Sequence, residues 1–302
     1  MKWIRILLLM QGSVLPKILG RVLLVTVCAS AVTYHHTLDP EFWKAELTPL
    51  PFSLIGVALS IFLGFRNNTA YDRFWEGRKL WGRLINTTRS WSRQVLSLVD
   101  EGTQPPTLRQ RELVREMVGY VHGLRAWLRF ADVKAAAGPH LAPPVLDALE
   151  GAPNPPARIL QHLGAEVART FRDGALNAYH LPALDKTLSD LTDIQGGCER
   201  IRNTPIPFAY TALMHRIVAI YCFALPFGII EEVGTMTPFV VAFVSYAFFG
   251  LDAIGEEIEE PFGFDPNDLP LDQLSNVIER DLIFAIGDAP PPARVPVDRR
   301  LT

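Results

Sequence analysis

The chain has 302 residues, of which 49% are hydrophobic and 20% are charged, and its mean hydropathy is +0.16. A positive mean hydropathy argues against an ordinary soluble enzyme, and the many apolar residues exclude intrinsic disorder, because their burial can offset the entropy of ordering. The net charge of −3 argues against a nucleic-acid partner. The three cysteines, Cys28, Cys198 and Cys222, are too few and too scattered for a disulfide framework.

Four apolar runs predict membrane spans. Leu47–Phe65 and Val233–Leu251 each contain 19 residues without Asp, Glu, Lys or Arg, close to the roughly 20 residues with which a helix crosses a bilayer. Val22–Tyr34 and Ile217–Ile230 reach that length only when a flanking arginine is included, and buried helices of a soluble core are the alternative for this pair. We predict four transmembrane helices, at about residues 18–36, 47–65, 209–230 and 233–251.

Basic residues mark one side of the predicted spans. They are Lys2, Arg5, Lys17 and Arg21 before the first span, and Arg66, Arg73, Arg78, Lys79, Arg83, Arg89 and Arg93 after the second. The connections on the other side are acidic, with Asp39, Glu41, Glu46, Glu231 and Glu232. Because loops rich in lysine and arginine stay in the cytoplasm, we expect both termini to be cytoplasmic.

The N-terminal region also admits a secretory signal peptide, because the apolar segment VLLVTVC precedes the small residues Ala29-Ser30-Ala31. Against this alternative, the basic region would be about twenty residues long and would already contain the apolar run Ile4–Met10. Cleavage would remove the first helix only and would leave the rest of the topology unchanged.

Residues 66–204 and 252–286 show helical patterning without sustained alternation, so we predict an all-α cytoplasmic region. The second span is expected to continue as one helix to about Leu98. A second amphipathic helix is indicated by Leu113, Met117, Val121, Leu124 and Leu128. The proline-rich segment 138–157 is predicted to be a surface linker, followed by helices at about 158–173 and 181–202, and the tail 287–302 is predicted to be disordered.

Sequence motifs of enzymes are missing. There is no H-E-x-x-H, G-x-S-x-G, Walker-type loop or G-x-G-x-x-G, and of the seven histidines only the adjacent pair His35-His36 is closely spaced. An intramembrane enzyme would need ionisable residues that face each other within the bilayer, which the two 19-residue runs do not supply. We therefore predict no catalytic residues and no cofactor.

One stripe in the second span could line a pathway. Val57, Ile61 and Phe65 are spaced at i, i+4 and i+8 and so share one helix face. The same helix carries small residues that let neighbouring helices approach closely, namely Gly56, Ala58, Ser60 and Gly64. Such a stripe usually packs in a core. It becomes a pore constriction only when copies of the helix surround an axis, because one four-helix subunit cannot enclose a water path.

Three long segments resemble the bacterial branch of the bestrophin family. They are FSLIGVALSIFLGFRNNTAYDRFWEGRKLWG (52–82), IQGGCERIRNTPIPFAYTALMHR (194–216) and EEIEEPFGFDPNDLPLD (256–272), and they occur in the order found in the family. The resemblance implies a bacterial ion channel in the inner membrane, built as a homopentamer with four membrane helices per subunit around a central pore. It also implies passage of small inorganic ions, chloride or other anions in most members and cations in some.

The resemblance also implies site residues. The hydrophobic neck of the pore would be Val57, Ile61 and Phe65, and the second, cytoplasmic aperture would be Leu176. Animal members of the family bind calcium through an acidic stretch whose counterpart here is interrupted by Pro266 and Asn267. We therefore expect that calcium is not required, and weak metal binding is the alternative, at Glu257, Glu260, Asp265 and Asp268.

A second class of function fits the same topology. A membrane scaffold or regulator, whose cytoplasmic helices bind a partner, would have the same four spans and would not conduct ions. Flux of ions through the purified protein distinguishes this alternative from a channel.

Overall fold

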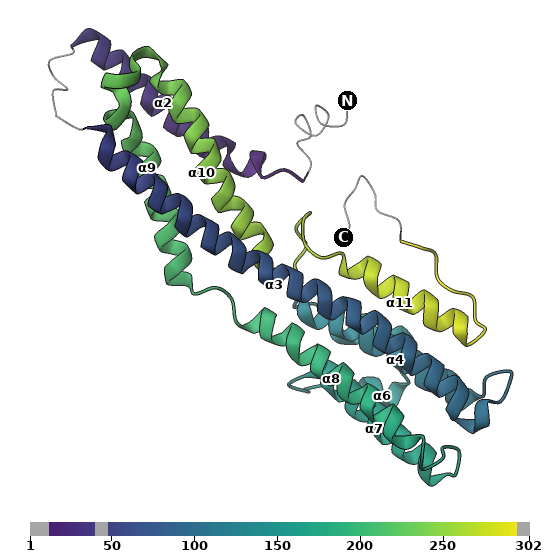
Figure 1. Ribbon diagram of the computed structural model, residues 1–302. Coiled ribbons are helices and arrows are strands. Elements are labelled where there is room, and N and C mark those ends of the chain that lie inside the picture. Colours follow the sequence, from purple (N-terminus) through teal and green to yellow (C-terminus); the bar gives the residue numbers. More distant parts are fainter. Residues whose placement is uncertain (1–11, 40–47, 295–302) are drawn as a thin grey trace. The chain divides into compact units, whose positions relative to one another are not determined.

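The computed structural model describes residues 12–39 and 48–294, which form helices joined by turns (Figure 1). Within these residues there is no β-strand, and one isolated antiparallel bridge joins Val99 to Leu176. The predicted all-α fold class is confirmed. Several residues used in the predictions lie outside the described residues, namely Lys2, Arg5, the run Ile4–Met10, Glu41, Glu46 and the end of the tail, 295–302.

The chain divides into two compact units. Unit 1 consists of Met1–Phe74 and Pro205–Glu260, and unit 2 consists of Trp75–Thr204 and Pro261–Thr302. One helix, α3 (Pro49–Leu98), belongs to both units and contains 50 residues, so the prediction that the second span continues to Leu98 is confirmed. Its prolines lie in the first turn only, where a missing backbone N–H removes no helical hydrogen bond.

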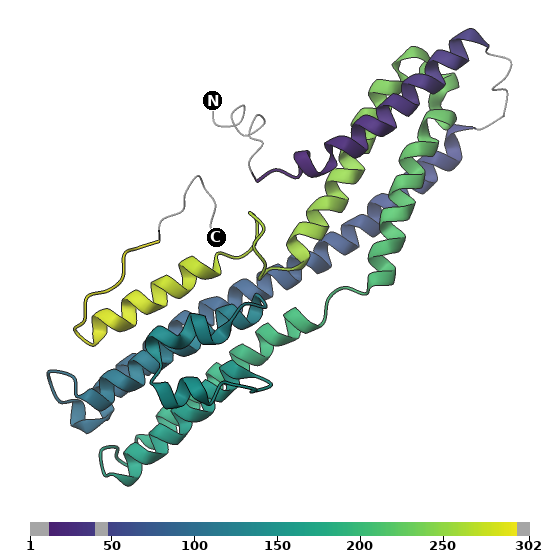
Figure 2. The ribbon, with the colours of Figure 1, turned by 180° about the vertical axis from the view of Figure 1, so that it is seen from behind.

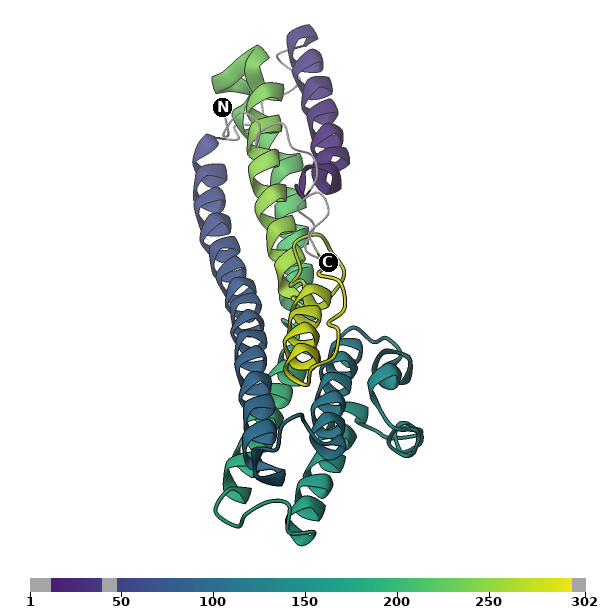
Figure 3. The same ribbon diagram turned by 90° about the vertical axis from the view of Figure 1, so that its right-hand side faces the viewer.

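Unit 1 is built from α2 (Leu15–Leu38), α9 (Phe208–Val233), α10 (Thr237–Glu259) and the first part of α3. α2 packs along α10 and contacts α9, and α9 also contacts α10 (Figure 3). α2 runs without a break through Ala29-Ser30-Ala31, and Ala29 is buried in the core of the unit. This packing favours a spanning helix over a cleaved signal peptide.

Three helical stretches are long and apolar enough to cross a membrane: Leu15–Leu38, Pro49–Leu98 and Phe208–Glu259. The last stretch comprises α9 and α10, which are joined by a single 3-10 turn, η3 (Gly234–Met236). Gly234 has φ 58° and ψ −131°, a conformation that residues with a Cβ rarely adopt. The chain reverses at this turn, because α9 and α10 lie side by side (Figure 1).

Unit 2 is organised around α4 (Leu108–Leu128), which contacts α7 (Pro155–Arg172), α8 (Leu181–Asn203) and α11 (Leu271–Ala285) (Figure 2). A capping box between Thr107 and Gln110 begins α4 and satisfies backbone N–H groups of its first turn. The five apolar residues that predicted this helix are all buried. The helices expected at about 158–173 and 181–202 correspond to α7 and α8.

The prediction of a surface linker at 138–157 is wrong. α5 (Val133–Ala137) leads into the 3-10 turn η2 (Gly138–His140), and α6 (Pro143–Asp147) follows. Prolines occupy the first positions of η2, α6 and α7, where their fixed φ favours helix initiation. The proline content therefore marks helix starts here, and the segment contributes buried side chains such as Val145 and Leu149.

Residues 287–294 belong to the tail that is predicted to be disordered, but the structure shows specific contacts for them. The Arg294 backbone N–H donates to Asn276 Oδ1 at 2.9 Å, and Asn276 Nδ2 donates to the Pro292 carbonyl at 3.2 Å. Asp288 forms an ion pair with Arg111 at 2.8 Å. Prolines cannot donate backbone hydrogen bonds but still accept them, so this segment is held along α11 by side chains of the folded unit.

Candidate ion pathway and the charged cluster beside it

The membrane part of α3 has one packing face. Gly56, Leu59, Leu63, Arg66 and Ala70 are all buried and recur at helical spacing. At Gly56 the approach of α9 is close, because a Cβ there would lie 2.7 Å from Tyr221 Oη. This face attaches α3 to the other helices of unit 1.

The predicted neck stripe lies on the opposite face of α3. Val57, Ile61 and Phe65 are 61%, 53% and 62% exposed in the single chain. The stripe is therefore not part of the core of the subunit. Gly64 lies beside the stripe. A Cβ added at Gly64 would have no other atom within 4 Å, so this residue makes no close contact with the rest of the described subunit.

Polar residues follow the stripe on the same face. Asn68 and Asp72 lie seven positions after Ile61 and Phe65, which corresponds to two helical turns. Both side chains are exposed. A carboxylate thus follows the apolar stripe directly, and the stripe has no charged residue of its own.

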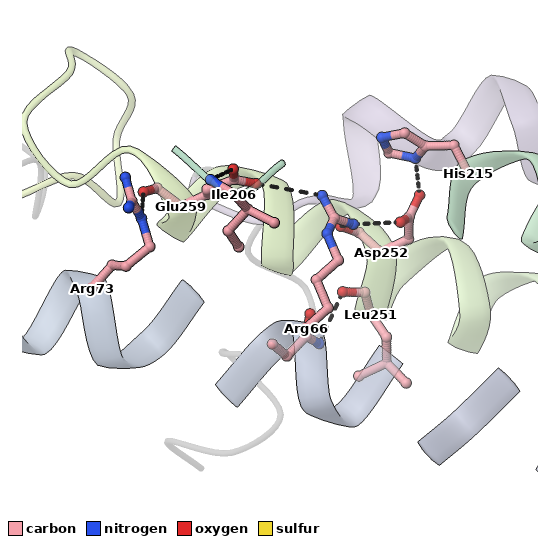
Figure 4. Close-up of polar contacts among 8 residues, drawn as sticks. Arg66, Arg73, Ile206, His215, Leu251, Asp252 and Glu259 are labelled. Atoms are coloured by element: carbon pink, nitrogen blue, oxygen red, sulfur yellow. Dashed lines mark hydrogen bonds and ion pairs between the residues drawn. The ribbon is translucent and has the colours of Figure 1, made fainter. Parts of the chain in front are cut away.

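A buried charged cluster lies behind the stripe. Arg66 is 1% exposed, and its Nη1 donates to Asp252 Oδ1 at 2.6 Å (Figure 4). His215 Nδ1 lies 2.5 Å from the other carboxylate oxygen of Asp252, and Arg66 Nη2 lies 3.7 Å from Glu259 Oε2. Asp252 therefore joins α3, α9 and α10.

Further hydrogen bonds surround this cluster. Asn67 Nδ2 donates to the Leu251 carbonyl at 3.0 Å, and Arg73 Nε donates to the Glu259 carbonyl at 3.0 Å. Glu259 Oε1 accepts the backbone N–H of Ile206 at 3.1 Å, where the chain enters α9. Gly255 allows this close approach, because a Cβ there would lie 2.3 Å from Asn67 Oδ1 and the Asn67 side chain would have to move.

The cluster fixes the position of the predicted neck. Arg66 follows Phe65 directly, so its ion pair sets both the depth and the rotation of the stripe relative to α10. Removing one partner of a buried ion pair leaves an unpaired charge and costs about 3–5 kcal/mol. From the sequence alone, Arg66 is interpreted only as one of the basic residues that mark the cytoplasmic side, and its role in the core of unit 1 is missed.

Leu176, the predicted aperture residue, is buried in the single chain. It is 3% exposed and forms the β-bridge with Val99, so its side chain lies in the core of unit 2, and its role at the aperture stays a prediction. Tyr179, in the same connection between α7 and α8, is 90% exposed. The N–H of Tyr179 donates to Asn177 Oδ1 at 2.9 Å, which closes a tight turn beneath its ring.

Three of the four acids predicted as an alternative metal site, Glu257, Asp265 and Asp268, make other contacts. Glu257 in unit 1 is buried, and its Oε1 lies 3.6 Å from Lys17 Nζ. In unit 2 the carboxylate of Asp268 accepts the backbone N–H of Asp265 at 2.7 Å, which closes the turn before α11. α11 itself begins after Pro270 without a side-chain cap, so Asp268 does not cap this helix. Metal binding at these acids stays a prediction.

The geometry defines a helical membrane protein whose longest helix carries an outward apolar stripe. Residues 1–283 match the model of a family described as Bacterial/Fungal Bestrophin protein. The chain belongs to this family, as its resemblance indicated.

Relatives of known name match the chain over nearly its whole length. The voltage-dependent anion channel-forming protein RSc3414 of Ralstonia nicotianae is 43% identical and covers 95% of this chain and 94% of its own length. The voltage-dependent anion channel-forming protein YneE of Escherichia coli K12 is 40% identical, with 98% and 96% covered. A crystal structure of a bacterial bestrophin homolog from Klebsiella pneumoniae has 35% identity and a TM-score of 0.84, and covers 90% of this chain and 100% of its own. These relatives place the chain in a channel-forming class of membrane proteins and not among enzymes.

Proposed function

We propose that this chain forms a homopentameric channel for small monovalent ions, with chloride or other anions as the main cargo. The observation that carries the proposal is the exposed apolar stripe of Val57, Ile61 and Phe65 on the face of α3 opposite its packing face. In a ring of subunits this stripe would form a dry neck about 12 Å long at 1.5 Å per residue. In such a neck a hydrated ion finds no replacement ligands.

Each subunit would cross the bacterial inner membrane four times with both termini in the cytoplasm. The turn at Gly234–Met236 supports four crossings, since it divides Phe208–Glu259 into two antiparallel helices of 26 and 23 residues. Either helix is long enough for a bilayer that needs about 20 residues. Labelling of single cysteines placed at Thr37 and Thr235 from the outside only would test this orientation.

Oligomerisation is required by the proposal. A single subunit has no lumen along α3, because its stripe faces away from the other helices of unit 1. Native mass measurement in detergent should give five copies. A monomer at moderate concentration would exclude both the pentamer and the neck.

Anion passage is supported by the names of the relatives and not by the neck, because apolar residues do not select the sign of an ion. The decisive experiment is ion flux from purified protein in liposomes, with reversal potentials measured under a salt gradient. Flux with an anion-directed reversal potential is the expected result. A folded, inserted protein without flux would favour the scaffold alternative.

A second narrow point is proposed at Tyr179. Its exposed ring lies in the connection between α7 and α8, where the resemblance implies the cytoplasmic aperture. Replacing Tyr179 with Ala should increase flux moderately. Leu176→Ala, a change in the core of the same unit, should destabilise the protein by about 2–5 kcal/mol without increasing flux.

Calcium is proposed to be unnecessary for opening. One carboxylate oxygen of Asp268 already accepts the backbone N–H of Asp265 in the turn that precedes α11, and Pro266 and Asn267 interrupt the acidic stretch, which leaves fewer carboxylate oxygens for a hard cation. Flux should therefore be similar in chelator and in added calcium. Loss of flux in chelator, restored by calcium, would contradict this proposal.

A further inference from the structure

Two histidines and a glutamate meet in unit 2. His122 comes from α4, His140 from η2 and Glu279 from α11. His122 Nε2 lies 3.0 Å from Glu279 Oε2, and His140 Nε2 lies 3.5 Å from Glu279 Oε1. Potential ligand atoms of the three residues all lie within 4.8 Å of one another.

The two imidazole rings lie nearly parallel. The rings stack with centroids 5.3 Å apart and an angle of 9° between their planes. Each ring therefore directs its Nε2 to the same carboxylate, one to each oxygen. The contact of His140 is at the outer limit of a hydrogen bond, so this ring is positioned near Glu279 without being firmly bonded to it.

The donor atoms suit a metal ion. Each imidazole has a ring nitrogen that can bind a cation when it carries no proton, and Glu279 supplies a carboxylate oxygen. The three side chains thus offer two nitrogen ligands and one oxygen ligand.

Nearby arginines are paired with other acids. Arg125 forms an ion pair with Asp272 at 3.0 Å, and Arg115 forms one with Asp288 at 2.6 Å. Each of these two arginines thus contacts an acid other than Glu279. Among the described residues, His122, His140 and Glu279 form a group of three side chains whose potential ligand atoms lie close enough together to hold one metal ion.

We propose that His122, His140 and Glu279 form a binding site for a divalent transition metal, with Zn²⁺ as the best fit. Two imidazoles and one carboxylate are a common zinc ligand set, completed by a water molecule in tetrahedral geometry. Calcium and magnesium fit poorly, because they prefer oxygen ligands throughout. The bound ion would join α11 to α4 and to the η2 turn.

The inference does not depend on conduction, so its test measures binding. Full-length protein in detergent is stripped with chelator and titrated with zinc by calorimetry, and its zinc content is then determined. We expect one zinc per chain. Cobalt in place of zinc should give the visible absorption bands of a four-coordinate site with nitrogen and oxygen ligands.

Two variants identify the ligands. His140→Ala and Glu279→Gln should each weaken zinc binding by more than about 100-fold, since even second-shell changes at metal sites cost 10–100-fold. Both should also abolish the increase in unfolding temperature that zinc causes in the unaltered protein. Glu279→Gln is nearly isosteric and can still accept the hydrogen bond from His122. This variant should therefore stay folded even if His140→Ala does not.

The matched control is His162→Ala. His162 belongs to the same unit and also contacts a glutamate, with Nδ1 2.7 Å from Glu116 Oε1, but it lies outside the group of three. Zinc binding of this variant should equal that of the unaltered protein. The proposal is overturned if the unaltered protein binds no stoichiometric zinc, or if His140→Ala and Glu279→Gln bind it as tightly as the control.

Discussion

The two units bury apolar side chains in different ways. In unit 2, α4 is surrounded by α7, α8 and α11, and it buries 14 of its 21 residues within the subunit. In unit 1, α2 and α10 direct large apolar side chains outward, among them Val27, Phe239 and Phe243. Unit 2 therefore has a core of its own, whereas unit 1 needs lipid or further copies of the chain to cover its surface.

The units also differ in their use of charge. Unit 1 buries one compact cluster around Arg66 and Asp252, in surroundings that are otherwise apolar. Unit 2 has exposed ion pairs, such as that of Lys186 and Asp190, in addition to the largely buried pair of Arg129 and Asp272. Water cannot replace the lost partner of a buried charge, so we expect the loss of a charge in the Arg66 cluster to cost far more than the loss of an exposed charge in unit 2.

The largest effect is expected from Asp252→Leu. This change leaves Arg66 buried and without its closest partner, so unit 1 should lose about 3–5 kcal/mol of stability. The double variant Arg66→Met with Asp252→Leu should recover most of that loss, because a buried pair can be replaced by apolar residues. Thermal unfolding and yield in detergent measure both.

The control for this prediction is Lys186→Ala, which removes the exposed pair of unit 2. Its effect should stay within about 1 kcal/mol. Equal losses from Asp252→Leu and Lys186→Ala would show that the buried cluster is no more important than a surface pair.

The next largest effect is expected from substitutions on the two faces of α3, which should change stability and conductance in different ways. Leu59, 2% exposed, lies on the packing face, so Leu59→Ala should cost about 2–5 kcal/mol and should not increase conductance. Ile61→Ala on the exposed stripe should cost much less and should increase conductance, because a wider neck is more easily wetted. Single-channel recording and unfolding of both variants test the neck assignment. A well-assembled Ile61→Ala protein with unchanged or reduced flux would contradict it.

A pH effect is expected in unit 2. Burial raises the pKa of Glu116 from 4.5 to about 7, and the nearby His162 opposes that shift only in part. Between these two pH values the folded state binds more protons than the unfolded state, so stability should fall as the pH rises from about 4.5 to about 7. Glu116→Gln should remove this loss, which amounts to about 2–3 kcal/mol at pH 8.

Urea unfolding at pH 5 and pH 8 measures the difference. Glu150→Gln, a change of an exposed glutamate elsewhere in unit 2, is the control and should leave the pH dependence as it is. A pH dependence of Glu116→Gln equal to that of the unaltered protein would show that another group is responsible.

The smallest effect is expected from Asp72→Asn. Its carboxylate follows the apolar stripe on the same exposed face, so it would repel anions at one end of the neck. A unit charge at 4 Å in water is worth about 1 kcal/mol, so the ratio of chloride to sodium permeability should rise by about fivefold at most. Reversal potentials under a salt gradient measure this ratio, and high salt should reduce the difference.

The fold could be predicted where the periodicity is strong. The apolar residues from Leu113 to Leu128 lie on one face of α4, and the continuation of the second span to Leu98 follows from apolar residues that recur beyond Phe65. The prediction of a linker at 138–157 is wrong because proline has two different effects on helices. It ends helices in their interior but also begins them, and composition does not distinguish the two.

The candidate site could be predicted only where its residues are close in sequence. Val57, Ile61 and Phe65 share a helix face by spacing alone. The sequence does carry a signal for the pair of Arg66 and Asp252, since each follows one of the two 19-residue apolar runs directly and both runs are predicted to end on the same side of the membrane. His122 and Glu279 are 157 positions apart, and only the packing of α11 on α4 brings them together.

The length of α3 sets a limit on the neck. At 1.5 Å per residue its 50 residues extend about 75 Å, against about 30 Å for the hydrocarbon layer of a bilayer. A pathway that follows this helix is a series of electrical resistances, in which the apolar stripe occupies about 12 Å. Widening the stripe would raise the current only until the longer, polar remainder of the path carries most of the resistance. The gain from Ile61→Ala should therefore level off, and further trimming of Val57 should add little.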